Sequence, residues 1–268
     1  MIPKKIHYVW LGGGEKPELV RKCIESWKRF CPDYEIREWG DRELLECGNR
    51  YALDAYRNRK LAFASDYLRL KALYEYGGFY FDTDLEVLKP LDLFLGDTLT
   101  MCSDLWGEVI GLTTAFIGSE AKSPAIGGFM QSYDGFRFFR DDGEMNVTPN
   151  NSLMRDYLER EYGMKLESTD ETIDLGSGMK IYPRNYFCNS KQGWAYHHYA
   201  GSWVPAWRRN LVARAGQYKL LFFKWKKDRK NADKVKAPAL QANERKLAAI
   251  KLGERKVYML VKMAESQA

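Results

Sequence analysis

Short apolar segments alternate with amphipathic ones through the first part of the chain. Residues 5–10 form an apolar run that predicts a buried strand, and residues 11–14, with three glycines, predict a loop after it. In residues 17–30, apolar positions recur near helical spacing, and residues 34–39 then alternate as a second strand. This strand–helix–strand order predicts an α/β domain that opens in the manner of nucleotide-binding folds.

A second strong helix is predicted over residues 59–76, which are rich in Leu, Ala and Tyr. Gly77-Gly78 ends it, residues 79–81 read as a short buried strand, and Asp82-Thr83-Asp84 stands at the end of that strand. Further strands are expected at residues 99–103, 114–118 and 179–182, a helix at 153–162, and an extended aromatic segment at 196–203.

Charge divides the chain after Trp203. The 268 residues carry a formal net charge of +6, yet residues 204–268 hold 17 Lys and Arg against 5 Asp and Glu, which leaves the first 203 residues mildly acidic. We therefore expect a main α/β domain over residues 1–203 and a basic extension over residues 204–268. Apolar positions at helical spacing among the basic residues 208–230 predict that the extension is helical.

The basic extension suggests a polyanionic partner. A basic helix with an aromatic apolar stripe suits the face of an anionic membrane, and it equally suits packing on the catalytic domain with the charges in solvent. Nucleic acid is not favoured, because the sequence shows no readout module.

Cysteine content bears on the compartment. The five cysteines are odd in number and form no CxxC pair, which predicts free thiols in a reducing compartment. No signal-peptide run and no apolar window long enough to span a bilayer is present. The sequence predicts a cytoplasmic protein, peripheral on the inner membrane face if the basic helix docks there.

Asp82-Thr83-Asp84 is the clearest candidate for chemistry. Two carboxylates one residue apart on an extended chain point to the same side, where they can hold a hard divalent cation that also binds phosphate oxygens. A D-x-D triplet alone is often only a solvated turn. Here it ends an apolar strand, and in open α/β sheets ligands bind at the strand ends.

Other segments offer supporting groups. Asp66 and Arg69 are three residues apart on the second helix, and they form either an ordinary ion pair or a grip on sugar hydroxyls and diphosphate. His197 and His198 offer a third metal ligand or are simply packed, and on a strand only one of them faces a given side. Trp10 stacks on a nucleobase or belongs to the core.

These segments, in this order, resemble the family 32 glycosyltransferases, which carry a DXD sugar-binding region and include bacterial members of capsular and exopolysaccharide type. More distantly they resemble the glucosyltransferase domains of large clostridial toxins. The matching stretches are IPKKIHYVWLGG, LAFASDYLRLKALYEYGGFYFDTD and HHYAGSW, within residues 2–203. The resemblance implies a GT-A-like fold with a mixed central sheet and transfer with retention at the anomeric carbon.

The resemblance also implies roles for single residues. Metal and diphosphate are assigned to Asp82 and Asp84, with His198 as the further metal ligand, or His197 if the register shifts by one. Asp66 and Arg69 match the pair that holds the donor hexose. The remaining donor-binding residues implied are Val9, Trp10, Gly12, Tyr80, Thr83, Asn150 (or Asn151), Ser202 and Trp203.

The function expected from the sequence is a hexosyltransferase that uses Mn²⁺ or Mg²⁺. Its donor is a nucleotide-sugar, with UDP-hexose favoured, and its acceptor a glycan, lipid-linked in capsule or exopolysaccharide synthesis. Two alternatives are a metal-dependent phosphohydrolase, which usually needs more acidic ligands and a second metal, and a protein that binds nucleotide-sugars without turnover. Metal-dependent release of the nucleotide from the donor distinguishes them.

Overall fold

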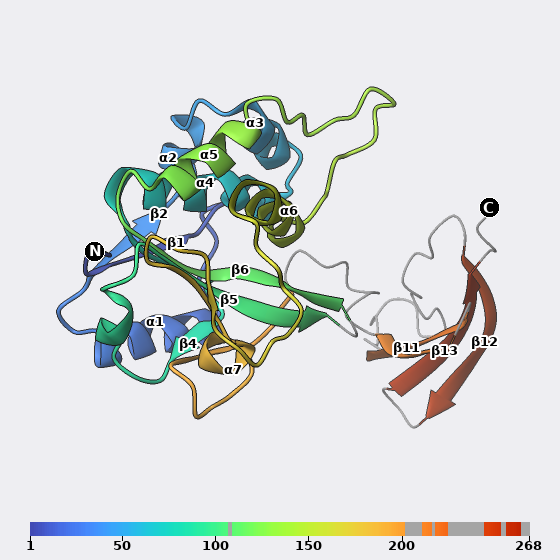
Figure 1. Ribbon diagram of the computed structural model, residues 1–268. Helices are drawn as coiled ribbons and strands as arrows, with labels where there is room; N and C mark the ends of the chain where they lie inside the picture. The colour runs from blue at the N-terminus through green and yellow to red at the C-terminus, as the bar shows by residue number, and fades with distance from the viewer. Residues whose placement is uncertain (107–108, 202–210, 216–217, 225–243, 253–255, 264–268) are drawn as a thin grey trace. The chain divides into compact units, whose positions relative to one another are not determined.

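The structure is a computed structural model that describes residues 1–106, 109–201, 211–215, 218–224, 244–252 and 256–263 (Figure 1). The chain divides into two units, Met1–Ala200 and Gly201–Ala268, and each is described by itself. No helix among the described residues has the length and apolar character needed to cross a bilayer.

The first unit is built around a seven-stranded mixed sheet of order β2-β1-β3-β6-β5-β8-β7. Strand β1 pairs in parallel with β2 and β3, and β5 pairs in parallel with β8, whereas β6 runs antiparallel to both β3 and β5. The strands are β1 (Lys5–Val9), β2 (Glu35–Trp39), β3 (Gly78–Phe81), β5 (Leu99–Trp106), β6 (Val109–Ser119), β7 (Ile173–Asp174) and β8 (Met179–Tyr182). The predicted α/β class with a mixed central sheet is confirmed.

Helices cover both faces of this sheet, and two short strands form a separate pair, β4 (Leu85–Val87) with β9 (Ala195–His197). Figure 1 shows α1, β4 and α7 on one side of the sheet and α2 to α6 on the other. The helices are α1 (Glu18–Phe30), α2 (Asp41–Leu45), α3 (Arg50–Arg57), α4 (Leu61–Tyr76), the 3₁₀ turn η1 (Asp92–Phe94), α5 (Pro124–Ser132), α6 (Asn150–Tyr162) and α7 (Arg184–Phe187).

Alternation along β1 creates the two layers of core. Ile6 and Tyr8 pack with Trp27 of α1 in one apolar cluster, whereas Val9 belongs to the cluster on the opposite face, with Leu68 and Leu70 of α4. Successive side chains of a strand point to opposite faces, so a single strand contributes to both layers.

Helix α4 is buried along most of its length and on more than one side, as expected for a helix that is apolar all round. Two glycines then let the chain reverse into β3. Gly78 has φ +102°, and a Cβ there would lie 2.7 Å from the backbone oxygen of Lys5. Only glycine tolerates both this conformation and this close approach. The turn therefore sets β3 directly beside β1 and carries the chain to Asp82.

The second unit corrects one prediction. Its described residues form a four-stranded antiparallel sheet of order β10-β11-β13-β12, with β10 (Leu211–Ala215), β11 (Tyr218–Lys224), β12 (Glu244–Leu252) and β13 (Lys256–Met263). The predicted basic helix over residues 208–230 is therefore wrong where the chain is described, and membrane docking through such a helix is not supported. Residues 218–224 and 256–263 are rich in aromatic and β-branched residues, and antiparallel pairing satisfies their backbone groups.

Candidate active site

Asp82, Thr83 and Asp84 lie between β3 and β4, at the edge where the parallel strands β1 and β3 end. The Asp82 N–H donates to the Ala115 oxygen at 2.8 Å, and the Leu85 N–H donates to the Asp82 oxygen at 3.0 Å. The motif is therefore a tight turn rather than the extended chain expected from the sequence. A buried strand holds it on one side, and β4 holds it on the other.

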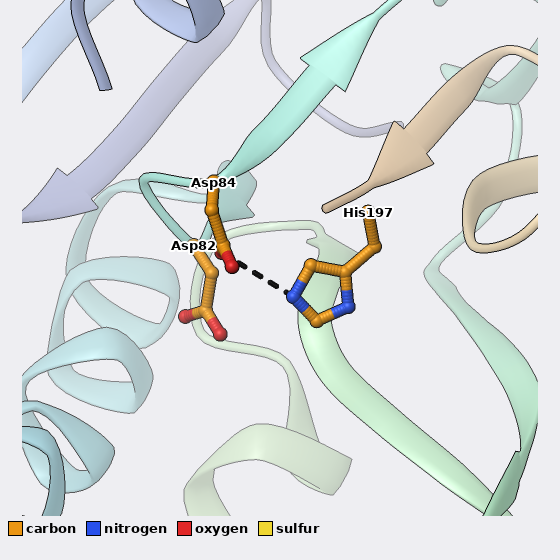
Figure 2. Close-up of side chains that lie close together, drawn as sticks. All are labelled: Asp82, Asp84 and His197. Atoms are coloured by element: carbon orange, nitrogen blue, oxygen red, sulfur yellow. Dashed lines mark ion pairs between the residues drawn. The ribbon is translucent and has the colours of Figure 1, made fainter. Parts of the chain in front are cut away.

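His197 completes a three-residue group with these carboxylates. It is the last residue of β9, which pairs with β4 so that His197 stands opposite Leu85. Its Nε2 atom lies 3.3 Å from Asp84 Oδ1, and one ligand atom from each of Asp82, Asp84 and His197 lies within 4.8 Å of the others. Figure 2 shows the two carboxylates and the imidazole gathered between the turn and the end of β9.

This donor set fits a divalent cation. Two carboxylates and one neutral imidazole are ligands that Mn²⁺ accepts, and Mg²⁺ is also held by carboxylates together with phosphate oxygens. Asp82, Asp84 and His197 are each partly or largely buried. Asp82, Asp84 and His197 form the metal group. Among the described residues it is the one cluster of three such side chains.

Asp84 is held from several directions. The Ala200 N–H donates to Asp84 Oδ2 at 2.8 Å, and the His198 N–H donates to the Asp84 backbone oxygen at 3.0 Å. Burial favours the protonated acid, but the hydrogen bond and charge of His197 together with the Ala200 N–H outweigh it, so the pKa of Asp84 lies below its ordinary value. The carboxylate is thus kept ionised, as metal binding requires.

The two neighbouring histidines face different partners. His198 Nε2 lies 2.9 Å from Glu86 Oε2, on the other side of the β4–β9 ribbon from Asp84. The structure therefore brings His197 rather than His198 to the carboxylates. Alternation along β9 explains the difference, because adjacent residues on a strand point to opposite faces.

Asp66 and Arg69 form a buried ion pair beside the metal group. Arg69 Nη2 donates to Asp66 Oδ1 at 2.8 Å, and the side chains are only 6% and 10% exposed, respectively. Arg69 Nη1 donates to the Thr114 oxygen at 2.7 Å and lies 3.3 Å from Asp82 Oδ1. The sequence left open an ordinary surface pair, and the buried position on α4 excludes it.

Tyr80 extends the same network. Its hydroxyl donates to Asp82 Oδ1 at 2.9 Å, and the Arg69 guanidinium lies 4.6 Å from the centre of its ring. Burial raises the pKa of Asp66 to about 7, against the opposing charge of Arg69 and with the help of Asp82. Asp66, Arg69, Tyr80 and Asp82 therefore act as one electrostatic unit.

Val9 is the last residue of β1, and Trp10 and Gly12 follow it at the same sheet edge. Val9 is buried, whereas Trp10 is only partly buried and donates through Nε1 to the Gly14 oxygen at 2.7 Å. Gly12 has φ +86°, and its N–H donates to Asp41 Oδ1 at 2.8 Å. Asp41, which starts α2, is a residue that sequence reasoning missed. Its position after β2 was the available indication.

Asn150 lies buried at the start of α6 and donates to the Tyr133 hydroxyl at 2.6 Å, while its Oδ1 atom has no partner among the described residues. Tyr133 was also missed; it lies close enough to Asp66 for that carboxylate to contribute to its raised pKa, after the larger effect of burial. Asn151 Oδ1 instead accepts from the Ser152 N–H at 3.0 Å. Ser202 and Trp203 lie outside the described residues.

Comparison with known proteins identifies the class. Residues 17–106 match the family described as "Glycosyltransferase sugar-binding region containing DXD motif". The matched range contains Asp66, Arg69, Asp82 and Asp84. Over these residues the match confirms the resemblance stated from the sequence, and it supports the expectation of a glycosyltransferase.

Solved structures and curated proteins were also compared. The structure "PaToxG Glycosyltransferase" is similar over 60% of this chain and 70% of its own, with 21% sequence identity and a TM-score of 0.48. A structure described as a transferase mutant is similar over 61% of this chain and 86% of its own, with 10% identity and a TM-score of 0.36. A search of the curated proteins gave no match to the chain.

Proposed function

We propose that the protein transfers a hexose from a UDP-linked sugar to a glycan hydroxyl, with dependence on a divalent metal and with retention at the anomeric carbon. One observation carries the proposal. The carboxylates and imidazole of Asp82, Asp84 and His197 adjoin the buried Asp66–Arg69 pair through the 3.3 Å contact between Arg69 Nη1 and Asp82 Oδ1. Asp82 thus links the candidate metal-binding group to the buried ion pair.

The metal would be held by Asp82, Asp84 and His197. When bound, Mn²⁺ or Mg²⁺ supplies positive charge that stabilises the departing diphosphate. The protein contributes the orientation of the ligands. Ala200 and His198 fix Asp84 through their N–H groups, and the Tyr80 hydroxyl fixes one oxygen of Asp82.

Arg69 and Asp66 would position the donor hexose. Because the Thr114 oxygen and Asp66 both accept from Arg69, the guanidinium has one orientation and loses little freedom when a ligand binds. A buried carboxylate accepts hydrogen bonds from sugar hydroxyls, and a buried guanidinium donates to phosphate or hydroxyl oxygens. Trp10, partly buried at the end of β1, would stack on the base.

Transfer with retention is proposed to occur by attack on one face of the sugar. The bond between the acceptor oxygen and the anomeric carbon forms on the face from which the diphosphate departs. The bond from that carbon to the phosphate oxygen breaks, and the acceptor proton passes to the departing phosphate. No covalent nucleophile of the protein is used.

The acceptor is proposed to be a glycan, and a lipid-linked one remains a prediction from the sequence. The cytoplasmic location also remains a proposal. It is supported by the five cysteines, all of which are buried and free of disulfide bonds.

A donor screen tests the function. The full chain is stripped with EDTA, and its thermal unfolding is followed with UDP-glucose, UDP-galactose, UDP-N-acetylhexosamines and GDP-mannose, each with and without Mn²⁺. A donor at 100 times its Kd stabilises the folded state by about 2.7 kcal/mol. We expect one UDP-sugar to stabilise the wild type only with Mn²⁺, and we expect Asp84→Asn to lose that response.

Product analysis then separates the possible reactions. A glycosyltransferase releases UDP and, without acceptor, free hexose, whereas a phosphohydrolase releases UMP and hexose 1-phosphate. Release of UMP would refute the proposed reaction. Donor binding without any turnover, even with glycan acceptors present, would identify a binding protein instead.

A further inference from the structure

Tyr199 links the metal group to a buried carboxylate of the central sheet. Its hydroxyl donates to Asp104 Oδ1 at 3.0 Å, and the centre of its ring lies 4.2 Å from the centre of the His197 imidazole. Asp104 belongs to β5, a strand distant in sequence from the DXD turn. One side chain therefore contacts both the sheet and the histidine of the metal group.

The backbone at Tyr199 makes the same connection. Tyr199 has φ +48°, a left-handed conformation that residues other than glycine seldom adopt. The next N–H, that of Ala200, donates to Asp84 Oδ2 at 2.8 Å, while the His197 imidazole lies 3.3 Å from Oδ1 of the same carboxylate. The strained turn thus lets residues 197 and 200 reach both oxygens of Asp84. Such strain persists where the surroundings hold it in place.

Burial of the Asp104 carboxylate in the core is energetically unfavourable. It is 0% exposed, its Oδ1 accepts from the Leu105 N–H at 2.8 Å, and its Oδ2 has no hydrogen-bond partner among the described residues. The Arg184 guanidinium, 3.8 Å from Oδ1, compensates only part of the cost of burying a carboxylate. An apolar residue would suit the core better, so the carboxylate is best explained by what it holds.

We propose that Asp104 and Tyr199 are positioning residues for the metal group. The hydrogen bond between them keeps the Tyr199 ring against His197 and keeps the turn in the conformation that presents the imidazole and the Ala200 N–H to Asp84. The inference rests on the proposed function, because it assumes that Asp82, Asp84 and His197 bind the metal. Partners that orient metal ligands typically contribute 10- to 100-fold to metal affinity.

Mn²⁺ binding to the full chain without donor tests this role, measured from the electron paramagnetic resonance signal of free Mn²⁺. Tyr199→Phe removes the hydroxyl and keeps the ring, and we expect it to weaken Mn²⁺ binding about 10-fold or more. Asp104→Leu keeps the number of non-hydrogen side-chain atoms and should weaken binding similarly. In the Asp104→Leu background, Tyr199→Phe should then have no further effect.

Tyr182→Phe is the matched control. The Tyr182 hydroxyl donates at 2.8 Å to Asp97, a carboxylate that is 3% exposed and lies outside the metal group. This variant loses an equivalent tyrosine–aspartate hydrogen bond, so it should lower the melting temperature and leave Mn²⁺ affinity unchanged.

The outcomes distinguish a failure of the proposed metal site from a failure of the positioning role alone. If the wild type binds no Mn²⁺, or if Asp84→Asn binds it as tightly, the proposed metal site fails and the positioning role fails with it. If the wild type binds Mn²⁺ and Tyr199→Phe binds it equally well, the positioning role alone is wrong. Equal losses of affinity in Tyr199→Phe and Tyr182→Phe would also overturn it, because the effect would then be general destabilisation.

Discussion

Replacing Arg69 with methionine would leave a carboxylate in the interior without its cation. The side chains of Arg69 and Asp66 are 6% and 10% exposed, and Arg69 donates to Asp66 Oδ1 at 2.8 Å. Methionine is flexible and fills irregular space, so the change removes the charge and leaves little cavity. Removing one partner of a buried ion pair costs about 3–5 kcal/mol. A domain of ordinary stability, about 5–15 kcal/mol, would remain folded but strongly weakened.

The loss should depend on pH in a defined direction. Burial raises the pKa of Asp66 to about 7, from an ordinary value of 3.8, and Arg69 opposes that rise. Between these values the folded protein holds a proton that the unfolded chain has lost, so the stability contributed by Asp66 falls as pH rises toward the folded pKa. Without Arg69 the pKa of Asp66 in the folded protein is higher still, so the stability contributed by Asp66 keeps falling to a higher pH. The deficit of the variant should be larger at about pH 8 than at about pH 6.

Urea unfolding followed by tryptophan fluorescence at the two pH values measures this. Lys71→Met is a matched control, because Lys71 pairs with Glu75 at 2.6 Å on the same helix but both side chains are partly exposed. It should cost no more than about 1 kcal/mol. Asp66→Asn in the Arg69→Met background should recover most of the loss. A deficit no larger than that of Lys71→Met, or one independent of pH, would refute the reasoning.

Three further predictions concern other parts of the fold. Burial lowers the pKa of His7 from 6.5 to about 4, so between these values only the unfolded chain binds a proton at this residue. The unfolding free energy should therefore fall as the pH is lowered through this range, and it should fall less in His7→Gln. Gly78→Ala should lower the melting temperature much more than Gly13→Ala, since both have positive φ but a Cβ at Gly13 meets no atom within 4 Å; equal effects would contradict this. His197→Gln should weaken Mn²⁺ binding in calorimetry, whereas the same result for His198→Gln would contradict the observed register.

Local pattern was sufficient for the part of the fold that carries the DXD turn. The apolar period of residues 59–76, the two glycines after it and the short apolar run to Phe81 are all properties of neighbouring residues, and they predict α4 and β3 closely. The apolar character of their helix favoured burial of Asp66 and Arg69, although an ordinary ion pair stayed open until the structure placed them in the core. The short helices α2, α3 and α5 were not predicted, because helices of one to three turns have little periodicity to detect.

Contacts between segments that are distant in sequence could not be predicted from local sequence pattern. Tyr133 and Asp104 reach the site through the sheet and the helices packed on it, and nothing next to them in sequence indicates it. The basic extension also shows that local spacing does not reveal contacts between distant segments. Its apolar positions fit a helical period, yet residues 218–224 pair with residues 256–263, a partner that spacing within one segment does not reveal.

The choice between His197 and His198 depends on strand register. In the β4–β9 pair, Leu85 stands opposite His197 and Val87 stands opposite Ala195, and all four residues are buried. A shift of one residue would turn every side chain of β9 to the other face. That shift would expose Ala195 and move His197 away from Asp84, so the packing of buried apolar side chains selects the imidazole that joins the carboxylates. The candidate metal site is thus specified partly by residues outside its group of ligands.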